Sequence, residues 1–237
     1  MKPIYEPKGK AKEYGDLAIN IYTGCPHRCF YCFAPNVLHR DEDMFHNNVK
    51  PRLGIVETVK AQLEKEQITG KLIHLCFTCD PYPTGYDSTP TREIIKLLKA
   101  YGNHVQILTK GLGNRDFDLL DSNDRYGITL STGSNTRSAV LEPGSAHPSA
   151  RLCSLLAAKK RGISTWVSME PVLDESVLDY LEFYPHAFDL VKIGKLNYHP
   201  SDINWKEFGE KAESLCKKLG INYYIKESLR AEMEVQP

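Results

Sequence analysis

The chain has 237 residues, of which 41% are hydrophobic and 25% are charged, with 30 basic and 30 acidic side chains. This is the composition of a globular protein, and its balanced charge argues against a non-specific nucleic-acid binder, which carries a basic excess. Because no apolar run reaches about 18 residues and the first residues are polar, we expect neither a membrane span nor a secretory leader.

Strand-like and helix-like patterns alternate along the chain. In chain order they predict strand 17–22, helix 53–67, strand 72–77, helix 91–100, strand 105–109, short helix 117–120, strand 127–132, helix 148–160, strand 164–169, helix 175–183, strand 188–193, helix 205–219, strand 221–225 and a polar tail. Six or seven strand–helix units in a row predict a parallel sheet with helices outside it. Either a doubly wound open sheet or a curved, barrel-like sheet fits, although the G-x-G-x-x-G turn of a dinucleotide-binding sheet is missing. We expect one domain over residues 1–237, with a core from about 16 to 225.

Three of the seven cysteines crowd into the loop after the first expected strand. Cys25, Cys29 and Cys32 have the spacing C-x3-C-x2-C, and Tyr31 stands immediately before the third cysteine. Three thiolates hold three corners of a 4Fe-4S cubane and leave the fourth iron open to a small molecule. Crowded cysteines without a leader indicate metal chemistry in a reducing compartment, so we expect a cytoplasmic protein.

A zinc site is the alternative interpretation of these cysteines. Zinc takes four nitrogen or sulfur ligands in a closed tetrahedron, and Cys76, Cys79 or His27 would complete the set. The chain would then be a zinc-binding interaction protein without catalytic activity. A zinc knuckle usually pairs two C-x2-C units, however, which favours the iron–sulfur interpretation.

The cysteine motif resembles that of the radical S-adenosylmethionine (SAM) superfamily. The resemblance implies that a 4Fe-4S cluster and SAM are the cofactors and that reductive cleavage of SAM yields a 5′-deoxyadenosyl radical. It also favours the barrel-like architecture, as a partial (β/α)6 barrel of TIM-like form. In such barrels the chemistry takes place at the carboxyl ends of the strands.

The loops after the other expected strands narrow the resemblance to the spore photoproduct lyase group of DNA-repair enzymes. Two departures stand out, because Phe33 lies where the lyase carries a second tyrosine, and the chain is shorter than the lyase. The resemblance rests on Tyr22 to Cys25, Thr78 to Pro83, Ile107 to Lys110, Leu141 to Arg151 and Ser168 to Pro171.

The resemblance implies much of the SAM site. Lys110, at the end of the third expected strand, would reach the SAM carboxylate, because a cation beside a carboxylate makes a charge-assisted hydrogen bond. Ser131, at the end of the fourth, would hold the ribose hydroxyls, and Thr78 and Asp80 would receive the amino group. Ordinary strand-end and turn chemistry is the alternative for each of them.

The expected site also includes an adenine contact and an ion pair, each formed by residues from separate parts of the chain. Adenine would rest against Tyr31 and against the strand end at Met169 and Glu170, for which core packing is the alternative. Glu142 and Arg151 are nine residues apart and would form an ion pair that fixes their loop over the cofactor. An exposed pair of little energetic consequence is the alternative.

The remaining cysteines divide into catalytic and structural candidates. The lyase places a hydrogen-donating cysteine near the position of Cys76, and a thiol is a good hydrogen-atom donor to a carbon radical. We therefore expect Cys76, Cys79 and Tyr31 to be the catalytic residues, with a buried core cysteine as the alternative for Cys76. Cys153 and Cys216 fall on helical patterns and are expected in the core.

The expected function is hydrogen abstraction from a substrate by a radical SAM enzyme. The resemblance implies a nucleic-acid lesion, such as a thymine photoproduct, as the substrate, and a small molecule or peptide is the alternative. The expected partners are a small electron donor of the flavodoxin or ferredoxin type and, for the lesion substrate, DNA. We expect the protein to be a monomer.

Overall fold

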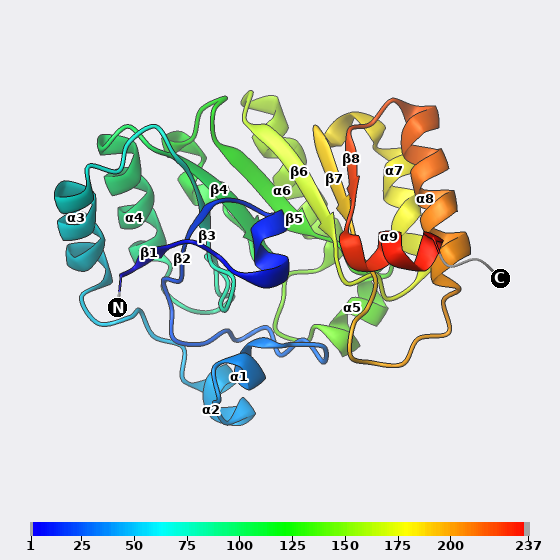
Figure 1. The fold of residues 1–237 in the computed structure, drawn as a ribbon, viewed down its shortest axis with the longest axis horizontal. Coiled ribbons are helices and arrows are strands. Elements are labelled where there is room, and N and C mark those ends of the chain that lie inside the picture. The colour runs from blue at the N-terminus through cyan, green and yellow to red at the C-terminus, as the bar shows by residue number, and fades with distance from the viewer. Residues whose placement is uncertain (1, 235–237) are drawn as a thin grey trace.

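The structure, a computed structural model, describes residues 2–234, so the predicted domain limits at 1 and 237 lie outside it. Its centre is an eight-stranded sheet whose strands follow one another in chain order (Figure 1). Strands β2 to β8 are parallel, whereas β1 pairs antiparallel with β2. Since β8 pairs with neither β1 nor β2 in this part of the chain, the sheet is an open, partial barrel, as predicted. The strands are β1 (Ile4–Tyr5), β2 (Leu17–Ile19), β3 (Leu72–Leu75), β4 (His104–Thr109), β5 (Arg125–Thr129), β6 (Ser164–Met169), β7 (Leu190–Ile193) and β8 (Tyr223–Ile225).

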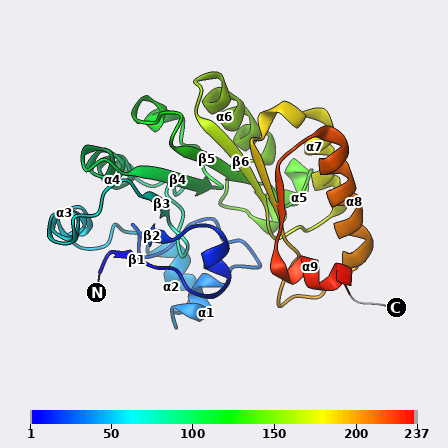
Figure 2. The same ribbon diagram turned by 45° about the horizontal axis from the view of Figure 1, so that its top comes forward.

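Helices cover the convex side of the curved sheet (Figure 2). Capping residues set several helix limits: α8 begins after Asn204, whose side chain accepts the Glu207 N–H, and ends at Gly220 with φ of +66°. None of the helices in the described part is long and apolar enough to cross a membrane. The α-helices are α1 (Ala34–Val37), α2 (Glu42–Asn47), α3 (Ile55–Glu66), α4 (Thr89–Ala100), α5 (Asn135–Leu141), α6 (Pro148–Lys160), α7 (Asp179–Phe183), α8 (Trp205–Leu219) and α9 (Glu227–Glu234), and the 3-10 helices are η1 (Gly9–Glu13), η2 (Asn114–Leu119), η3 (Glu175–Leu178) and η4 (Pro185–Ala187).

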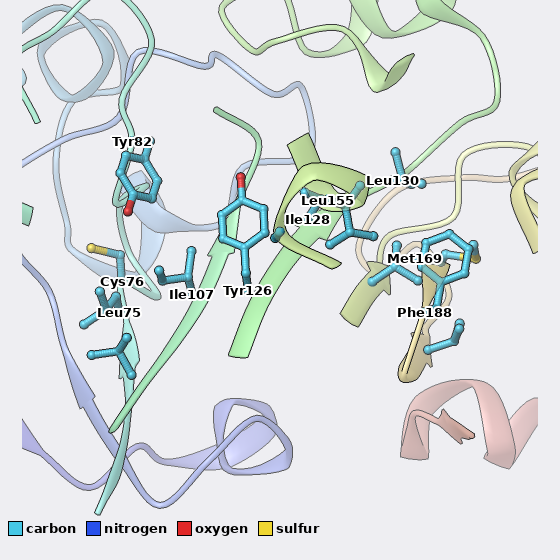
Figure 3. Close-up of a cluster of buried hydrophobic side chains, with 14 of the residues drawn as sticks. Leu75, Cys76, Tyr82, Ile107, Tyr126, Ile128, Leu130, Leu155, Met169 and Phe188 are labelled. Carbon is cyan, nitrogen blue, oxygen red and sulfur yellow. The ribbon is translucent and has the colours of Figure 1, made fainter. Parts of the chain in front are cut away.

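Alternate strand residues face opposite sides of the sheet, which separates the core from the barrel interior. The apolar set packs under the helices, where Ile107, Ile128 and Leu155 lie together (Figure 3). The other set is polar or aromatic and includes the buried side chains His74 and Trp166. The helices therefore stabilise the barrel from outside, and the interior keeps hydrogen-bonding groups.

The segment 9–16 enters this interior from the side between β2 and β8 (Figure 2). The Tyr14 ring lies 5.9 Å from the Trp166 ring, and the Lys226 ammonium lies 4.3 Å from the centre of the Tyr14 ring. Lys226 also pairs with the Glu13 carboxylate at 3.4 Å. Glu13 and Tyr14 thus belong to the barrel interior.

The predicted limits of helices and strands agree best with the structure for elements that have many apolar residues on one face. Helices 148–160 and 205–219 and strand 164–169 are confirmed with the same limits. The tail after β8 is polar, as expected, but most of its described part forms α9, which was not predicted and which buries Leu229 completely. The prediction for Cys153 is wrong: it is exposed, since Leu152 and Leu155 are the α6 residues that turn inward, whereas Cys216 is buried as expected. The sequence also gave no signal for β1, α1, α2 and α5, which are short.

Candidate functional site

The loop that carries the three cysteines is held between two neighbouring segments by close backbone contacts. A side chain on Gly24 would lie 2.0 Å from the Phe45 carbonyl oxygen, and one on Gly144 would lie 2.1 Å from the Pro26 carbonyl oxygen. Only glycine allows backbones to approach so closely. The His46 ring also lies against the loop, with Nδ1 2.7 Å from the Cys25 carbonyl oxygen. The cysteine loop is therefore positioned by α2 on one side and by the loop after α5 on the other.

The three cysteines are free thiols in this loop, and their spacing can be compared with that of a zinc site. Tetrahedral zinc with Zn–S distances of about 2.3 Å would bring its sulfur ligands to about 3.8 Å from one another. Within residues 2–234, the only three metal-ligating side chains whose ligand atoms all lie within 4.8 Å of one another are His104, Asp121 and Asp124. A cubane spaces its thiolates more widely, because each binds a different iron. The donor set thus fits a cluster held by three cysteines.

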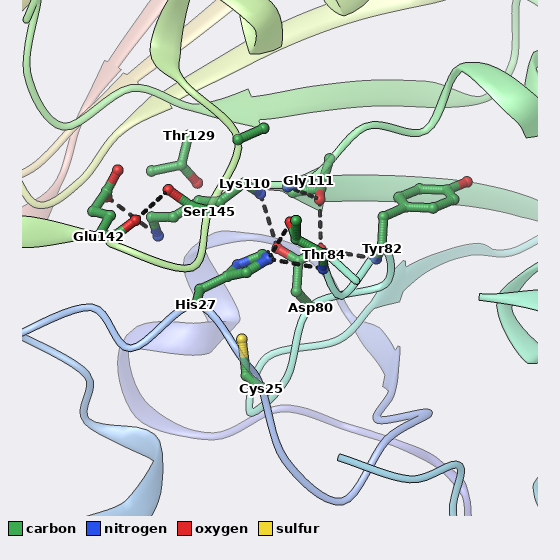
Figure 4. A network of polar contacts seen from close by, with 12 residues as sticks. Cys25, His27, Asp80, Tyr82, Thr84, Lys110, Gly111, Thr129, Glu142 and Ser145 are labelled. Atoms are coloured by element: carbon green, nitrogen blue, oxygen red, sulfur yellow. Dashed lines mark hydrogen bonds and ion pairs between the residues drawn. The ribbon is translucent and has the colours of Figure 1, made fainter. Parts of the chain in front are cut away.

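His27, the imidazole that a zinc site would use, is committed to other partners (Figure 4). Its Nε2 accepts the Thr84 backbone N–H at 3.4 Å, and its Nδ1 lies 3.5 Å from Asp80 Oδ2. Burial, more than any neighbouring charge, lowers the pKa of His27 to about 4. A neutral His27 therefore links the cysteine loop to the turn after β3.

Asp80 is buried and joins three segments of the site. Its Oδ1 accepts the Tyr82 N–H at 2.8 Å and the Thr109 hydroxyl at 2.5 Å. Its Oδ2 accepts the Lys110 backbone N–H at 2.8 Å and lies 3.5 Å from His27 Nδ1. These contacts give Asp80 a role in positioning the end of β4. Its contact with the SAM amino group stays a prediction.

Lys110 brings a positive charge to the end of β4, beside the cysteine loop. Its ammonium lies 4.0 Å from Glu142 Oε1 and 5.3 Å from the centre of the Tyr31 ring. Burial acts to lower the pKa of Lys110, but Cys29 and Glu142 raise it more, so it stays above its usual value. A buried cation whose carboxylate partner Glu142 is 4.0 Å away is suited to binding an anionic ligand group.

Glu142 connects the cysteine loop to the sheet and to α6. The Tyr31 hydroxyl and the Ser131 hydroxyl both donate to Glu142 Oε1, the latter at 3.0 Å. The Arg151 guanidinium donates to Oε2 at 2.7 Å, and neither charged side chain is exposed. The predicted ion pair is present, and the exposed alternative is wrong. Tyr31, Ser131 and Arg151, from three separate segments, therefore meet at one carboxylate.

Thr78 carries an unsatisfied polar group in the turn after β3. Its Oγ1 is buried and has no hydrogen-bond partner in the structure, although its backbone N–H donates to Asn20 Oδ1 at 2.9 Å. A buried hydroxyl without a partner is costly and calls for an explanation, such as a ligand or a water molecule. The predicted contact of Thr78 with the SAM amino group would supply that partner.

Met169 and Glu170, the two residues at the end of β6 that are predicted to contact adenine, have different surroundings. Met169 is completely buried and packs in the hydrophobic core, and its contact with adenine stays a prediction (Figure 3). Glu170 instead turns to the barrel interior, where the Tyr14 hydroxyl donates to it and the Lys226 ammonium lies 2.9 Å away. Sequence reasoning missed Tyr14 and Lys226, because no local pattern places them in the interior.

The barrel interior also contains Lys192, which the sequence analysis did not assign. Its ammonium donates to the Glu13 carbonyl oxygen and lies 4.6 Å from the centre of the Tyr14 ring and 5.7 Å from that of Trp166. Burial lowers the pKa of Lys192 to about 8, and the charge of Lys226 acts in the same direction. The interior therefore combines aromatic rings with two lysines, of which Lys226 is paired with the Glu13 and Glu170 carboxylates.

Comparison with known proteins agrees with this geometry. The profile of the radical SAM superfamily matches residues 19–183. An uncharacterised protein of Methanocaldococcus jannaschii is 27% identical over 241 residues, which cover 95% of this chain and 88% of that protein. An uncharacterised protein of Mycobacterium tuberculosis is 29% identical over 170 residues, or 66% of this chain, and those residues make up about half of that relative, 49%.

Solved structures share the fold at low sequence identity. A spore photoproduct lyase mutant superposes with a TM-score of 0.68 at 14% identity, covering 93% of this chain and 78% of the lyase. Streptococcus suis SuiB superposes with a TM-score of 0.67 at 10% identity, covering 95% of this chain and 54% of SuiB. The superfamily profile spans more than half of the chain and includes all three loop cysteines. The chain therefore belongs to the radical SAM superfamily of enzymes, whose cofactors are a 4Fe-4S cluster and SAM.

Proposed function

We propose that this enzyme abstracts hydrogen from a nucleobase-bearing substrate, with a nucleic-acid lesion as the substrate class. The observation that carries the proposal is the group of rings and cations in the barrel interior. The Tyr14 ring lies 5.9 Å from each of the His74, Phe77 and Trp166 rings, and Lys192 lies among them. Bases stack on aromatic rings, and ammonium groups attract phosphate. The fold likeness to spore photoproduct lyase, whose crystals hold a dinucleoside spore photoproduct, supports the same class.

The chain's own residues would hold the reactants in place. Cys25, Cys29 and Cys32 would bind the cluster, and Lys110 would bind the carboxylate of SAM, while the Thr78 hydroxyl takes its amino group. When bound, these cofactors supply a 5′-deoxyadenosyl radical by one-electron reduction from a donor of the flavodoxin or ferredoxin type.

Other residues would position these groups or end the reaction. Glu142 accepts hydrogen bonds from Tyr31 and Ser131 and would hold both side chains in place to bind the nucleoside part of SAM. The thiol of Cys76, at the end of β3, would return a hydrogen atom to the product radical. Cys76 is 5% exposed and Cys79 is half-buried, so the thiols are shielded from bulk solvent.

The first part of the proposal is tested by electron paramagnetic resonance on anaerobically reconstituted, dithionite-reduced protein. A cluster signal that changes when SAM is added, with release of 5′-deoxyadenosine, is the expected result. A cluster signal indifferent to SAM would mean electron transfer alone, and bound zinc without iron would overturn the proposal.

The substrate class is tested by adding a thymine dinucleoside photoproduct to the reduced enzyme. We expect it to raise 5′-deoxyadenosine release and to be converted, and Phe77→Leu should reduce both effects. Phe183→Leu, at a ring that is 74% exposed on α7, is the matched control. Release that does not respond to the dinucleoside would favour the alternative, a small molecule or peptide.

Duplex DNA binding is a separate outcome of the same test. A DNA enzyme should bind duplex with a strong salt dependence, because it displaces counterions from phosphates. The zero net charge of this chain predicts weak duplex binding, so conversion of the dinucleoside without duplex binding would assign a short or single-stranded substrate.

A further inference from the structure

The turn after β3 holds a second pair of thiols outside the cysteine loop. Cys76 and Cys79 are three residues apart, and each thiol lies close enough to the other to shift its pKa. The Tyr22 backbone N–H donates to Cys79 Sγ at 3.4 Å. The two sulfur atoms therefore lie together against the end of β2.

The backbone at Cys76 brings the pair together. Its φ is +68°, a left-handed conformation that is uncommon for residues other than glycine. The Cys76 N–H is fixed by the Ile19 carbonyl oxygen at 2.8 Å. This sharp change of direction ends β3 and returns the chain, so that the side chain three residues later lies beside that of Cys76.

The surroundings make the two thiols unequal. Burial raises the pKa of the Cys76 thiol well above its ordinary value. Burial acts on Cys79 in the same direction, but the neighbouring Cys76 thiol, the Tyr22 N–H and the charge of Arg52 together lower its pKa. Cys79 is thus the thiol that ionises first, and Cys76 is the one that retains its proton.

We propose that Cys76 and Cys79 form a redox-active dithiol that closes into an intramolecular disulfide by exchange with a small organic disulfide. The Cys79 thiolate attacks one sulfur of the small disulfide, forms a mixed disulfide and releases one thiolate. That thiolate takes the proton of Cys76, and the Cys76 sulfur then attacks the Cys79 sulfur and displaces the second thiolate, which is protonated by water. The protein loses two electrons and two protons, and the small disulfide becomes two thiols.

Closing this disulfide would change two groups of the site. The Cys76 S–H bond would no longer be available as a hydrogen donor, and the cross-link would span the turn that carries the Thr78 hydroxyl. This consequence for turnover rests on the proposed function, whereas formation of the disulfide does not. Oxidation is therefore expected to lower 5′-deoxyadenosine release at least tenfold, and reduction to restore it.

The bond itself can be measured in the reconstituted full-length chain. The protein is equilibrated anaerobically in mixtures of reduced and oxidised dithiothreitol, quenched with acid, alkylated and digested with trypsin. Residues 72–92 form one tryptic peptide with Cys76 and Cys79, and the other five cysteines fall on other peptides. We expect this peptide to pass from doubly alkylated to unalkylated and two hydrogens lighter. A peptide that stays doubly alkylated in every mixture would overturn the inference, as would a stable mixed disulfide that never closes.

Two variants separate closure from general oxidation. Cys79→Ser should leave Cys76 alkylated in every mixture. In Cys153→Ser, at an exposed position on α6, the peptide 72–92 should lose its alkylation over the same mixtures as in the parent protein. If the peptide titrates but no 5′-deoxyadenosine is released in either state, the inference holds and the proposed function fails. If 5′-deoxyadenosine is released but the peptide does not become oxidised, the proposed function holds and the inference of a disulfide fails.

Discussion

Arg151 and Glu142 form an ion pair of 2.7 Å in which neither side chain is exposed to solvent. Burial by itself would raise the pKa of Glu142, but the charges of Lys110 and Arg151 lower it to about 2. The carboxylate is therefore charged at physiological pH. Because the Tyr31 hydroxyl donates to the same carboxylate, the pair holds the cysteine loop against α6.

Replacing Glu142 by glutamine should lower the free energy of unfolding by about 3–5 kcal/mol, because the buried Arg151 would lose its counter-charge. Urea unfolding monitored by circular dichroism would measure the loss. Glu93→Gln is the matched control, since Glu93 pairs with Lys96 where both side chains are exposed. The control should cost less than about 1 kcal/mol. Equal losses in the two variants would contradict the assigned role of the buried pair.

Replacing Lys110 by methionine should weaken SAM binding by roughly ten- to hundredfold. The variant keeps the length of the side chain but loses a charge-assisted hydrogen bond to the SAM carboxylate, which contributes about 1.5–3 kcal/mol. Equilibrium dialysis of SAM against the reconstituted protein would measure the change. Lys96→Met, at an exposed position on α4, should bind SAM like the parent. Unchanged affinity in Lys110→Met would remove this lysine from the SAM site.

Thr78→Val should separate stability from binding. Valine has nearly the same shape as threonine and removes a buried hydroxyl that has no partner. The free energy of unfolding should stay constant or rise by about 1 kcal/mol, because an unsatisfied polar group is lost. SAM affinity should fall at the same time. A variant that is less stable and binds SAM normally would show that the hydroxyl has a structural partner instead.

The buried His74 side chain is expected to cause part of the pH dependence of the free energy of unfolding. Burial, and then the charge of Lys192, lowers the pKa of His74 from 6.5 to about 3. The unfolded chain therefore takes up a proton at His74 as the pH falls through about 6.5, whereas the folded chain does not. The contribution of neutral His74 to the free energy of unfolding is therefore complete above that pH and is lost below it. Between pH 7.5 and pH 5 the loss should be about 2 kcal/mol. Urea unfolding at both pH values should show a smaller difference in His74→Gln than in the parent.

Gly127 sets the shape of the barrel interior. A Cβ at this position would lie 2.3 Å from the Trp166 ring, which packs directly over the glycine. Gly127→Ala should therefore lower the free energy of unfolding by about 1–3 kcal/mol through overpacking. Adding Trp166→Phe should restore part of the loss, because the smaller ring leaves room for the methyl group. Thermal unfolding of the single and double variants would test this, and losses that simply add would argue against the contact.

The sequence predicts the parts of this molecule that depend on neighbours along the chain. The strand 164–169 is confirmed because its apolar residues are consecutive, and the helix 205–219 because Gly220 ends it. The spacing of the loop cysteines is equally local, since all three lie within eight residues. Each of these features depends on residues within a short stretch of the sequence.

The parts that sequence reasoning missed depend on segments far apart in the chain. Asp80 accepts hydrogen bonds from the Thr109 hydroxyl and the Lys110 N–H at the end of another strand, and no local pattern indicates these contacts. Tyr14 lies in a polar segment without periodicity, and only the curvature of the sheet brings it to Ser168, at 3.0 Å. Such hydrogen bonds and interior packing are properties of the folded arrangement, so a linear pattern does not report them.

The segment 9–16 joins the two edges of the open barrel, and this has a consequence for how the chain folds as it is made. The Tyr224 hydroxyl donates to Glu13 Oε2 at 2.9 Å, across 211 positions of sequence, and Lys226 pairs with the same carboxylate. On a ribosome, Glu13 emerges 211 residues before Tyr224, and Lys226 emerges two residues after Tyr224. Contacts of such long separation form late and slowly. The interior would therefore stay open until β8 has been translated, after the other strands of the described sheet.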